Sequence, residues 1–177
     1  VGLVMGCLGM TKRPNYLPAL QACASVGQTI LIETWQNGFD PWKIHVGQML
    51  LTRDDLSVKR RHVGVRDTLE RLVKANIVPI INENDCISAA ELKFGDNDVL
   101  SALVASLVGA DLLVLLSTIP GLMNLKTGEV ISQVETLDDD IRSLAEGTRS
   151  PTAMGGMISK LNAASIATAS NCGVFIA

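Results

Sequence analysis

Two polar segments carry residue types that could do chemistry. Asn82-Glu83-Asn84-Asp85 directly follows an apolar run, and Gly95-Asp96-Asn97-Asp98 begins ten residues after Asp85. Amides and carboxylates of this kind hydrogen-bond a small polar ligand, and the carboxylates accept hydrogen bonds from an ammonium group. Asn and Asp also favour turns and helix N-caps, so a purely structural role stays open. A single cap, however, accounts for only one or two of these side chains.

A glycine-rich segment forms the second candidate. It reads Met154-Gly155-Gly156-Met157-Ile158-Ser159-Lys160. Backbone N–H groups at a helix N-terminus, with a lysine one turn into the helix, can cradle a phosphate. The segment is no Walker A loop, and no Gly-x-Gly-x-x-Gly occurs in the chain. A plain loop before a helix is the alternative interpretation.

A third loop, Ser117-Thr118-Ile119-Pro120-Gly121-Leu122, also leaves an apolar run. Its hydroxyl groups can contact a nucleotide or simply cap the end of a strand. The two histidines, His45 and His62, have no partner pattern and are interpreted as structural or solvent-facing.

Composition narrows the class of protein. The 177 residues are 47% hydrophobic and 19% charged, with a net charge of −3. Without a basic excess we expect no nucleic-acid partner. The four cysteines lie far apart, which favours reduced thiols in a cytoplasmic protein over a zinc or dithiol site. The run Val99–Leu116 holds a single charge, but Gly109-Ala110-Asp111 interrupts it, so we expect a helix, a turn and a strand rather than a membrane span.

Apolar periodicity predicts alternating helices and strands. Helices are expected over 15–37, from about Val65 to Asn76, from the cap at Asp96 to about Val108, over 138–147 and over 156–171. Strands are expected over 45–51, 77–81, 112–116 and 174–176, with a small hairpin over 122–131. Lys59-Arg60-Arg61 is interpreted as a solvated loop. Strands without polar alternation are typical of a parallel sheet covered by helices on both faces, so residues 1–177 are predicted to form one α/β/α layer domain. In such sheets ligands bind at the carboxyl ends of the strands, where the polar loops lie.

The order and spacing of five segments across nearly the whole chain resemble the glutamate 5-kinases. The segments are Ile44–Arg53, Arg66–Leu69, Val78–Asp85, Gly95–Asp98, and Gly155-Gly156-Met157 with Lys160. The kinase domain of pyrroline-5-carboxylate synthase is similar as well. The resemblance implies the amino acid kinase fold, a three-layer α/β/α sandwich with a mainly parallel sheet. It also implies ATP-dependent phosphorylation of the side-chain carboxylate of L-glutamate to glutamyl 5-phosphate, the first step of proline biosynthesis.

The resemblance further implies roles for single residues. Asp85 and Asn97 match glutamate-binding residues, and Asp98 matches an aspartate that organises catalytic lysines. Lys160 matches the lysine that stabilises the transferring phosphoryl group. The implied nucleotide-binding residues are Ser117, Thr118, Met154, Gly155, Gly156, Met157, Ile158, Ser159 and Lys160. Mg²⁺ is expected on the ATP phosphates rather than in a protein metal site. A cytoplasmic homo-oligomer, with proline as a possible inhibitor and no membrane partner, is implied too.

Departures from the family pattern leave alternatives open. Bacterial members usually carry Thr-Asp where this chain has Ser117-Thr118, and a threonine where it has Met154. The family's N-terminal lysine-glycine strand and its Ser-Gly-Ala substrate loop would lie upstream of Val1, so we expect residues 1–177 to lack both. One alternative is a related kinase of the same fold that acts on another amino acid or on a nucleotide. The other is a catalytically silent module that senses an amino acid such as proline.

Overall fold

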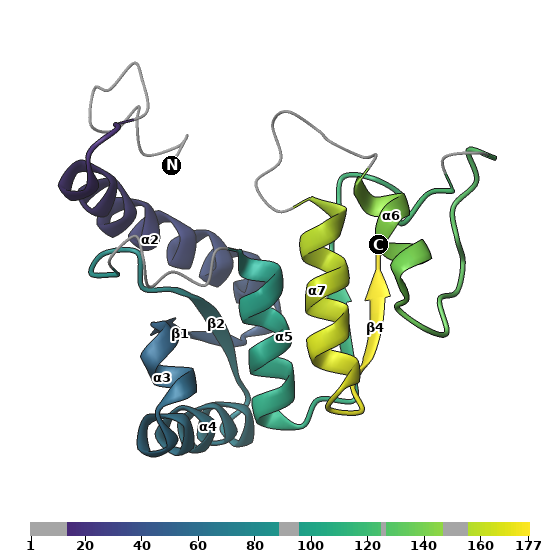
Figure 1. The fold of residues 1–177 in the computed structure, drawn as a ribbon. Coiled ribbons are helices and arrows are strands. Elements are labelled where there is room, and N and C mark those ends of the chain that lie inside the picture. Colours follow the sequence, from purple (N-terminus) through teal and green to yellow (C-terminus); the bar gives the residue numbers. More distant parts are fainter. Residues whose placement is uncertain (1–13, 89–95, 125–126, 147–155) are drawn as a thin grey trace. The chain divides into compact units, whose positions relative to one another are not determined.

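The structure, a computed structural model, describes residues 14–88, 96–124, 127–146 and 156–177 (Figure 1). The chain divides into two compact units, Val1–Lys93 and Phe94–Ala177. The glycine-rich residues Met154 and Gly155 lie outside the described residues.

The first unit is built around two parallel strands. Its elements are α2 (Leu17–Phe39), the 3₁₀ helix η1 (Asp40–Trp42), β1 (His45–Leu51), α3 (Arg53–Ser57), α4 (Lys59–Lys74) and β2 (Ile77–Glu83). Strand β1 has the predicted bounds, and it pairs with β2 in parallel register from His45 opposite Ile77 to Leu51 opposite Glu83. Strand β2 runs two residues further than predicted, so Asn82 and Glu83 belong to the strand and not to the loop after it.

Helices α2 and α4 lie on opposite sides of this strand pair (Figure 1). A Cβ atom on Gly47 of β1 would lie 3.0 Å from the Leu72 side chain of α4, so a glycine here allows the helix to approach closely. Asn82 of β2 stands opposite Leu50, three residues after Gly47, and its side chain contacts Gln28 of α2. Because side chains alternate along a strand, Gly47 and Asn82 face opposite sides of the pair. The predicted cover on both faces is therefore present in this unit.

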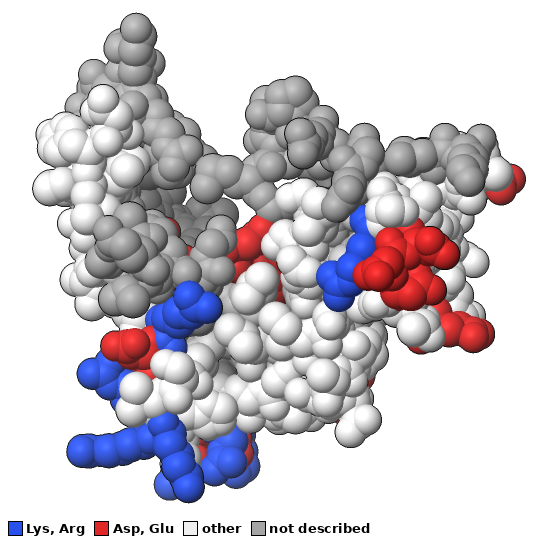
Figure 2. Space-filling view, viewed as in Figure 1, with Lys and Arg blue, Asp and Glu red and all other residues white. Residues whose placement is uncertain are grey.

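Two predictions in the first unit were wrong at helix ends. Lys59, Arg60 and Arg61 form the first turn of α4 and not a loop, although all three are exposed as expected. Figure 2 shows Lys and Arg side chains gathered over the region of α3 and α4. Helix α2 also continues through Gly38 to Phe39, and its C-cap is Asp40.

The second unit contains the other parallel strand pair. Its elements are α5 (Asn97–Val108), β3 (Leu112–Leu115), α6 (Asp139–Glu146), α7 (Met157–Thr168) and β4 (Gly173–Ile176). Strands β3 and β4 pair in parallel, from Leu112 opposite Gly173 to Leu115 opposite Ile176. An antiparallel bridge between Met123 and Val130 confirms the predicted hairpin.

Helix α5 begins and ends where the sequence predicts. The Asp96 carboxylate accepts a hydrogen bond from the Asp98 N–H at 2.8 Å and caps the helix. Gly109 ends the helix with a φ of +63°, a left-handed conformation that favours glycine. The run Val99–Leu116 is thus a helix, a turn and a strand. Within the described ranges, no helix combines the length and the apolar character needed to cross a bilayer.

Helices α5 and α7 lie side by side and run in the same direction over one face of β3 and β4 (Figure 1). Their contact is made of small residues, since Ala102 and Ala105 of α5 and Ala163 and Ala167 of α7 belong to one buried cluster. On the strands, Leu113 and Val174 pack against this cluster, whereas Leu112, Val114 and Phe175 are exposed. One face of this strand pair is therefore covered by helices within the unit, and the close packing brings the first turns of α5 and α7 together.

Candidate active site

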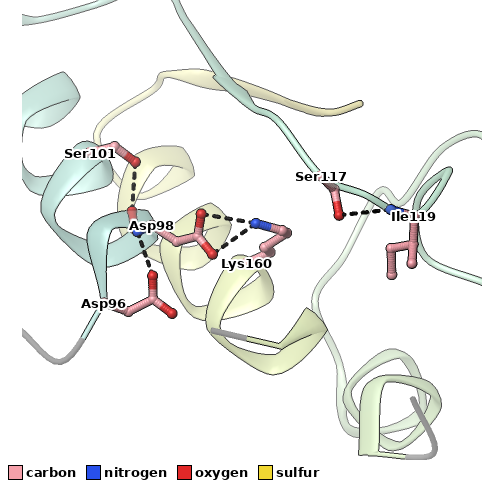
Figure 3. A network of polar contacts seen from close by, with 6 residues as sticks. All are labelled: Asp96, Asp98, Ser101, Ser117, Ile119 and Lys160. Carbon is pink, nitrogen blue, oxygen red and sulfur yellow. Dashed lines mark hydrogen bonds and ion pairs between the residues drawn. The ribbon is translucent and has the colours of Figure 1, made fainter. Parts of the chain in front are cut away.

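The first turns of α5 and α7 are joined by a buried ion pair between Asp98 and Lys160 (Figure 3). The Lys160 ammonium donates to both carboxylate oxygens of Asp98, at 3.0 and 2.9 Å. Lys160 is only 8% exposed. Desolvating two charges is costly, and a buried ion pair is weak evidence for a stabilising role. A buried lysine held by a carboxylate at two helix N-terminal turns therefore points to chemistry that needs a fixed positive charge.

Asp98 is itself held in place from both sides. Its N–H donates to the Asp96 carboxylate, and its carbonyl oxygen accepts a hydrogen bond from the Ser101 hydroxyl at 2.7 Å (Figure 3). Within the described residues, Asp98 is the acidic partner of the Lys160 ammonium. The contacts of Asp98 at the start of α5 thus fix the position of the Lys160 ammonium group.

The N-terminal turn of α7 contains two exposed residues and begins at a glycine. Gly156 is the extended N-cap residue, and no side chain among the described residues caps this helix. Gly156 and Ile158 are exposed, while Met157 is 3% exposed and packs with Leu122 and Leu161. Met157 is thus part of the core, and the exposed residues of this turn are Gly156 and Ile158.

The loop after β3 packs against the same end of α7. Ile119 contacts the buried cluster that contains Met157 and Leu161. The hydroxyl of Ser117 accepts a hydrogen bond from the Ile119 N–H at 3.3 Å (Figure 3). The Ser117 N–H donates to the carbonyl of Ala177, the residue that follows β4. The next residue, Thr118, is exposed. The loop that carries Ser117 and Thr118 therefore lies beside the first turn of α7, which contains Lys160.

Asp85 borders a cavity that belongs wholly to the first unit. The cavity has a volume of about 360 Å³ and lies between α2 and the carboxyl end of β2. Its polar wall includes Gln28 and Thr34 from α2 and Asn82, Glu83 and Asp85 from the other side. Carboxylates together with amides suit a small ligand that carries both an ammonium and a carboxylate group.

The described residues contain no group of three or more His, Cys, Asp and Glu side chains that could hold a metal ion. Lys160 and the first turn of α7 suit the anionic oxygens of a phosphate group.

The sequence of this chain matches a known protein family. The profile of the amino acid kinase family matches residues 5–177. The chain belongs to the amino acid kinase family.

Amino acid kinases similar to this chain include several named glutamate 5-kinases, which confirms the resemblance in the sequence. The one from Vibrio parahaemolyticus is 45% identical over 175 residues, which cover 96% of this chain and 46% of the relative. The one from Clostridium acetobutylicum is 43% identical over 182 residues, covering 100% of this chain and 68% of the relative. The one from Caldanaerobacter subterraneus is 43% identical, covering 94% and 46%. The chain thus spans about half the length of most of these relatives.

The structure brings several of the predicted site residues into one unit. Asn97 and Asp98 start α5, Lys160 lies in the first turn of α7, and the Ser117 loop packs against α7. Asp85 belongs to the first unit, so its approach to Lys160 stays a prediction. Gln28 was not predicted as a site residue, because a glutamine within a helix that also contains Gln21 and Gln36 carries no local sign of a partner 54 positions away.

Proposed function

We propose that the protein carrying this chain transfers the γ-phosphoryl group of ATP to the side-chain carboxylate of L-glutamate. A carboxylate oxygen forms a bond to the γ-phosphorus while the bond between that phosphorus and the β,γ-bridging oxygen breaks, giving glutamyl 5-phosphate and ADP. The attacking carboxylate is already ionised at neutral pH, so no general base is required. In the resembled family this reaction begins proline biosynthesis.

The observation that carries the proposal is the bidentate contact between Lys160 and Asp98. Phosphoryl transfer needs positioning and charge neutralisation more than covalent chemistry by the protein. An ammonium group held in advance costs little reorganisation when negative charge develops on the transferring group. Lys160 would neutralise that charge, and Asp98 would hold the ammonium group in place while ADP departs.

The nucleotide would lie between the loop after β3 and the N-terminal turn of α7. The backbone N–H groups of that turn would bind phosphate oxygens, and Ser117 and Thr118 would contact the nucleotide. Mg²⁺ bound through the phosphates would supply further charge neutralisation. Met154 and Gly155 belong to the same proposed nucleotide segment, on the basis of the sequence alone.

Glutamate would bind through Asp85 and Asn97. The Asp85 carboxylate at the cavity beside β2 suits the α-ammonium group, and the Asn97 amide suits a carboxylate. This assignment requires both units to belong to one domain, which we propose is a three-layer α/β/α sandwich with a mainly parallel sheet. The exposed apolar face with Leu112, Val114 and Phe175 supports a further covering layer.

A homo-oligomer is part of the same proposal. Trp35, Phe39 and Trp42 form an aromatic cluster at the end of α2 and η1, with Trp35 45% and Trp42 69% exposed. Large exposed aromatic side chains are enriched where protein surfaces meet. Inhibition by proline and a cytoplasmic location stay predictions.

The proposed reaction is tested by trapping its product. Full-length protein supplied with glutamate, ATP and Mg²⁺ is expected to release ADP and to form a hydroxamate when hydroxylamine is present. A yield no higher than in the control without glutamate contradicts the proposal. Preference for aspartate, N-acetylglutamate or UMP in the same assay indicates a related kinase. Calorimetry that detects glutamate or proline binding without ATP binding indicates a silent sensor.

Replacing Asp85 by alanine is expected to raise the KM for glutamate by roughly 10- to 100-fold with a smaller effect on kcat. Loss of a hydrogen bond to a charged group costs about 1.5–3 kcal/mol of binding, and the group transfers no proton in the reaction. Steady-state kinetics with varied glutamate measure this. The control is Asp67→Ala, which removes an exposed carboxylate of α4. An unchanged KM in Asp85→Ala would remove this residue from the glutamate site.

A further inference from the structure

The orientation of the Asn82 side chain is set by two hydrogen bonds. Its amide oxygen accepts from the backbone N–H of Glu83 at 2.9 Å. Because that donor cannot rotate away, the NH₂ group of Asn82 must point in the opposite direction, toward α2. There it donates to the Oε1 atom of Gln28 at 3.1 Å. The carboxamide of Asn82 is thus held between its own strand and the helix that faces it.

Both side chains line the cavity that Asp85 borders. An NH₂ group has two N–H donors and an amide oxygen has two lone pairs. The contacts to Gln28 and Glu83 use one of each, so within the described residues one donor and one acceptor of Asn82 remain for a ligand. A carboxamide fixed in this way selects among ligands, because a ligand must place its own acceptor and donor along the directions of the Asn82 N–H and the Asn82 oxygen lone pair.

Gln28 contacts Asn82 through its amide oxygen and not through its NH₂ group. Its Nε2 atom is buried and has no hydrogen-bond partner within the described part of the chain. A buried donor without a partner destabilises the fold. The hydrogen bond that Gln28 does make is the one that Asn82 needs, and it cannot turn its amide over without presenting a donor to a donor. Among the described residues, Gln28 therefore offers its acceptor to Asn82 while its own NH₂ group has no partner.

We propose that Gln28 is a positioning residue, which acts through Asn82 to preorganise the cavity for the amino-acid substrate. This inference rests on the proposed function. Gln28 is not expected to touch the reacting atoms, and its contribution is to substrate affinity rather than to the transfer step.

The test is a double-mutant cycle with Gln28→Met and Asn82→Ala in the full-length protein. Methionine keeps the length of the side chain and removes the strong acceptor. Gln28→Met is expected to raise the KM for glutamate about tenfold, which corresponds to one hydrogen bond, with kcat and the KM for ATP changed less than about twofold. Added to Asn82→Ala, the same substitution is expected to have no further effect on the KM for glutamate.

The matched control is Gln21→Met, seven residues earlier on the same helix and outside the cavity wall. It is expected to leave all three kinetic constants unchanged. Gln28→Ala repeats the test with a smaller side chain, and thermal melting reports whether each variant is folded.

The outcomes of these experiments distinguish a failure of the role proposed for Gln28 from a failure of the proposed function. An unchanged KM for glutamate in Gln28→Met, or effects of Gln28→Met and Asn82→Ala that simply add, overturns the role of Gln28 while the kinase activity stands. A wild-type protein that forms no hydroxamate from glutamate contradicts the proposed function, and this inference with it.

Discussion

Replacing Lys160 by alanine is expected to lower kcat for glutamyl phosphate formation by about a thousandfold, with smaller changes in the KM values for glutamate and ATP. The ammonium group lies in the first turn of α7, held by both oxygens of Asp98 in a buried site. In the variant, Lys160 would no longer neutralise the negative charge that develops on the transferring phosphoryl group. The bound substrates would keep their other contacts, so the KM values change less. Hydroxamate yield and ADP release measure the rate.

The alanine variant also leaves the Asp98 carboxylate buried without its cation, which is destabilising. The double variant Lys160→Met with Asp98→Asn removes both charges and is expected to fold yet remain inactive. Lys74→Ala is the control, because Lys74 is an exposed lysine of α4 that pairs, among the described residues, with the exposed Glu70. Turnover near the wild-type rate in Lys160→Ala would show that the reaction does not depend on this ammonium group.

Replacing Asp98 by asparagine is expected to lower kcat about a hundredfold. Asparagine keeps the size of the side chain, but it offers the ammonium group one acceptor oxygen and a repelling NH₂ donor. Lys160 then loses its bidentate anchor, and displacement of a catalytic group by about 1 Å can cost a hundredfold in rate. Single-turnover measurements of ADP formation separate this loss from slower product release.

Asp96→Asn is the matched control for this substitution, because it makes the same change of charge two residues earlier. Asp96 caps α5 through its side chain, and asparagine caps helices equally well. This variant is expected to retain both its stability and most of its kcat. Equal losses in the two variants would mean that the negative charge at the start of α5 matters, rather than the contact with Lys160.

Elements with strong local signals were predicted well. The short apolar run at His45–Leu51 indicated the bounds of β1, and Asp96 together with Gly109 indicated the ends of α5. The start of α4 was misplaced because its N-cap is Val58, which gives no polar capping signal. The end of α2 was predicted two residues early, at position 37, because the helix is ended by the turn at Asp40 and not by a left-handed glycine at Gly38.

In the candidate site, too, the sequence indicates single residues but not the contacts between them. Asp98 and Lys160 attract attention as single residues, since each stands where a helix is predicted to begin. Their contact across 62 positions depends on how closely α5 and α7 pack, and that distance is set by alanines that look like ordinary core residues. The bond between Gln28 and Asn82 depends likewise on which face of β2 meets α2.

The amino-acid sequence by itself determined which segments become helices and parallel strands, which side chains are available for charge neutralisation, and the resemblance to the glutamate 5-kinases. Those properties depend on neighbours within a turn or a strand, where propensity, capping and alternation act. Only the tertiary structure decided that Lys160 is held by Asp98 and Asn82 by Gln28. Such partners are selected by packing between elements, because a hydrogen bond or ion pair requires a distance of about 3 Å that no local pattern specifies.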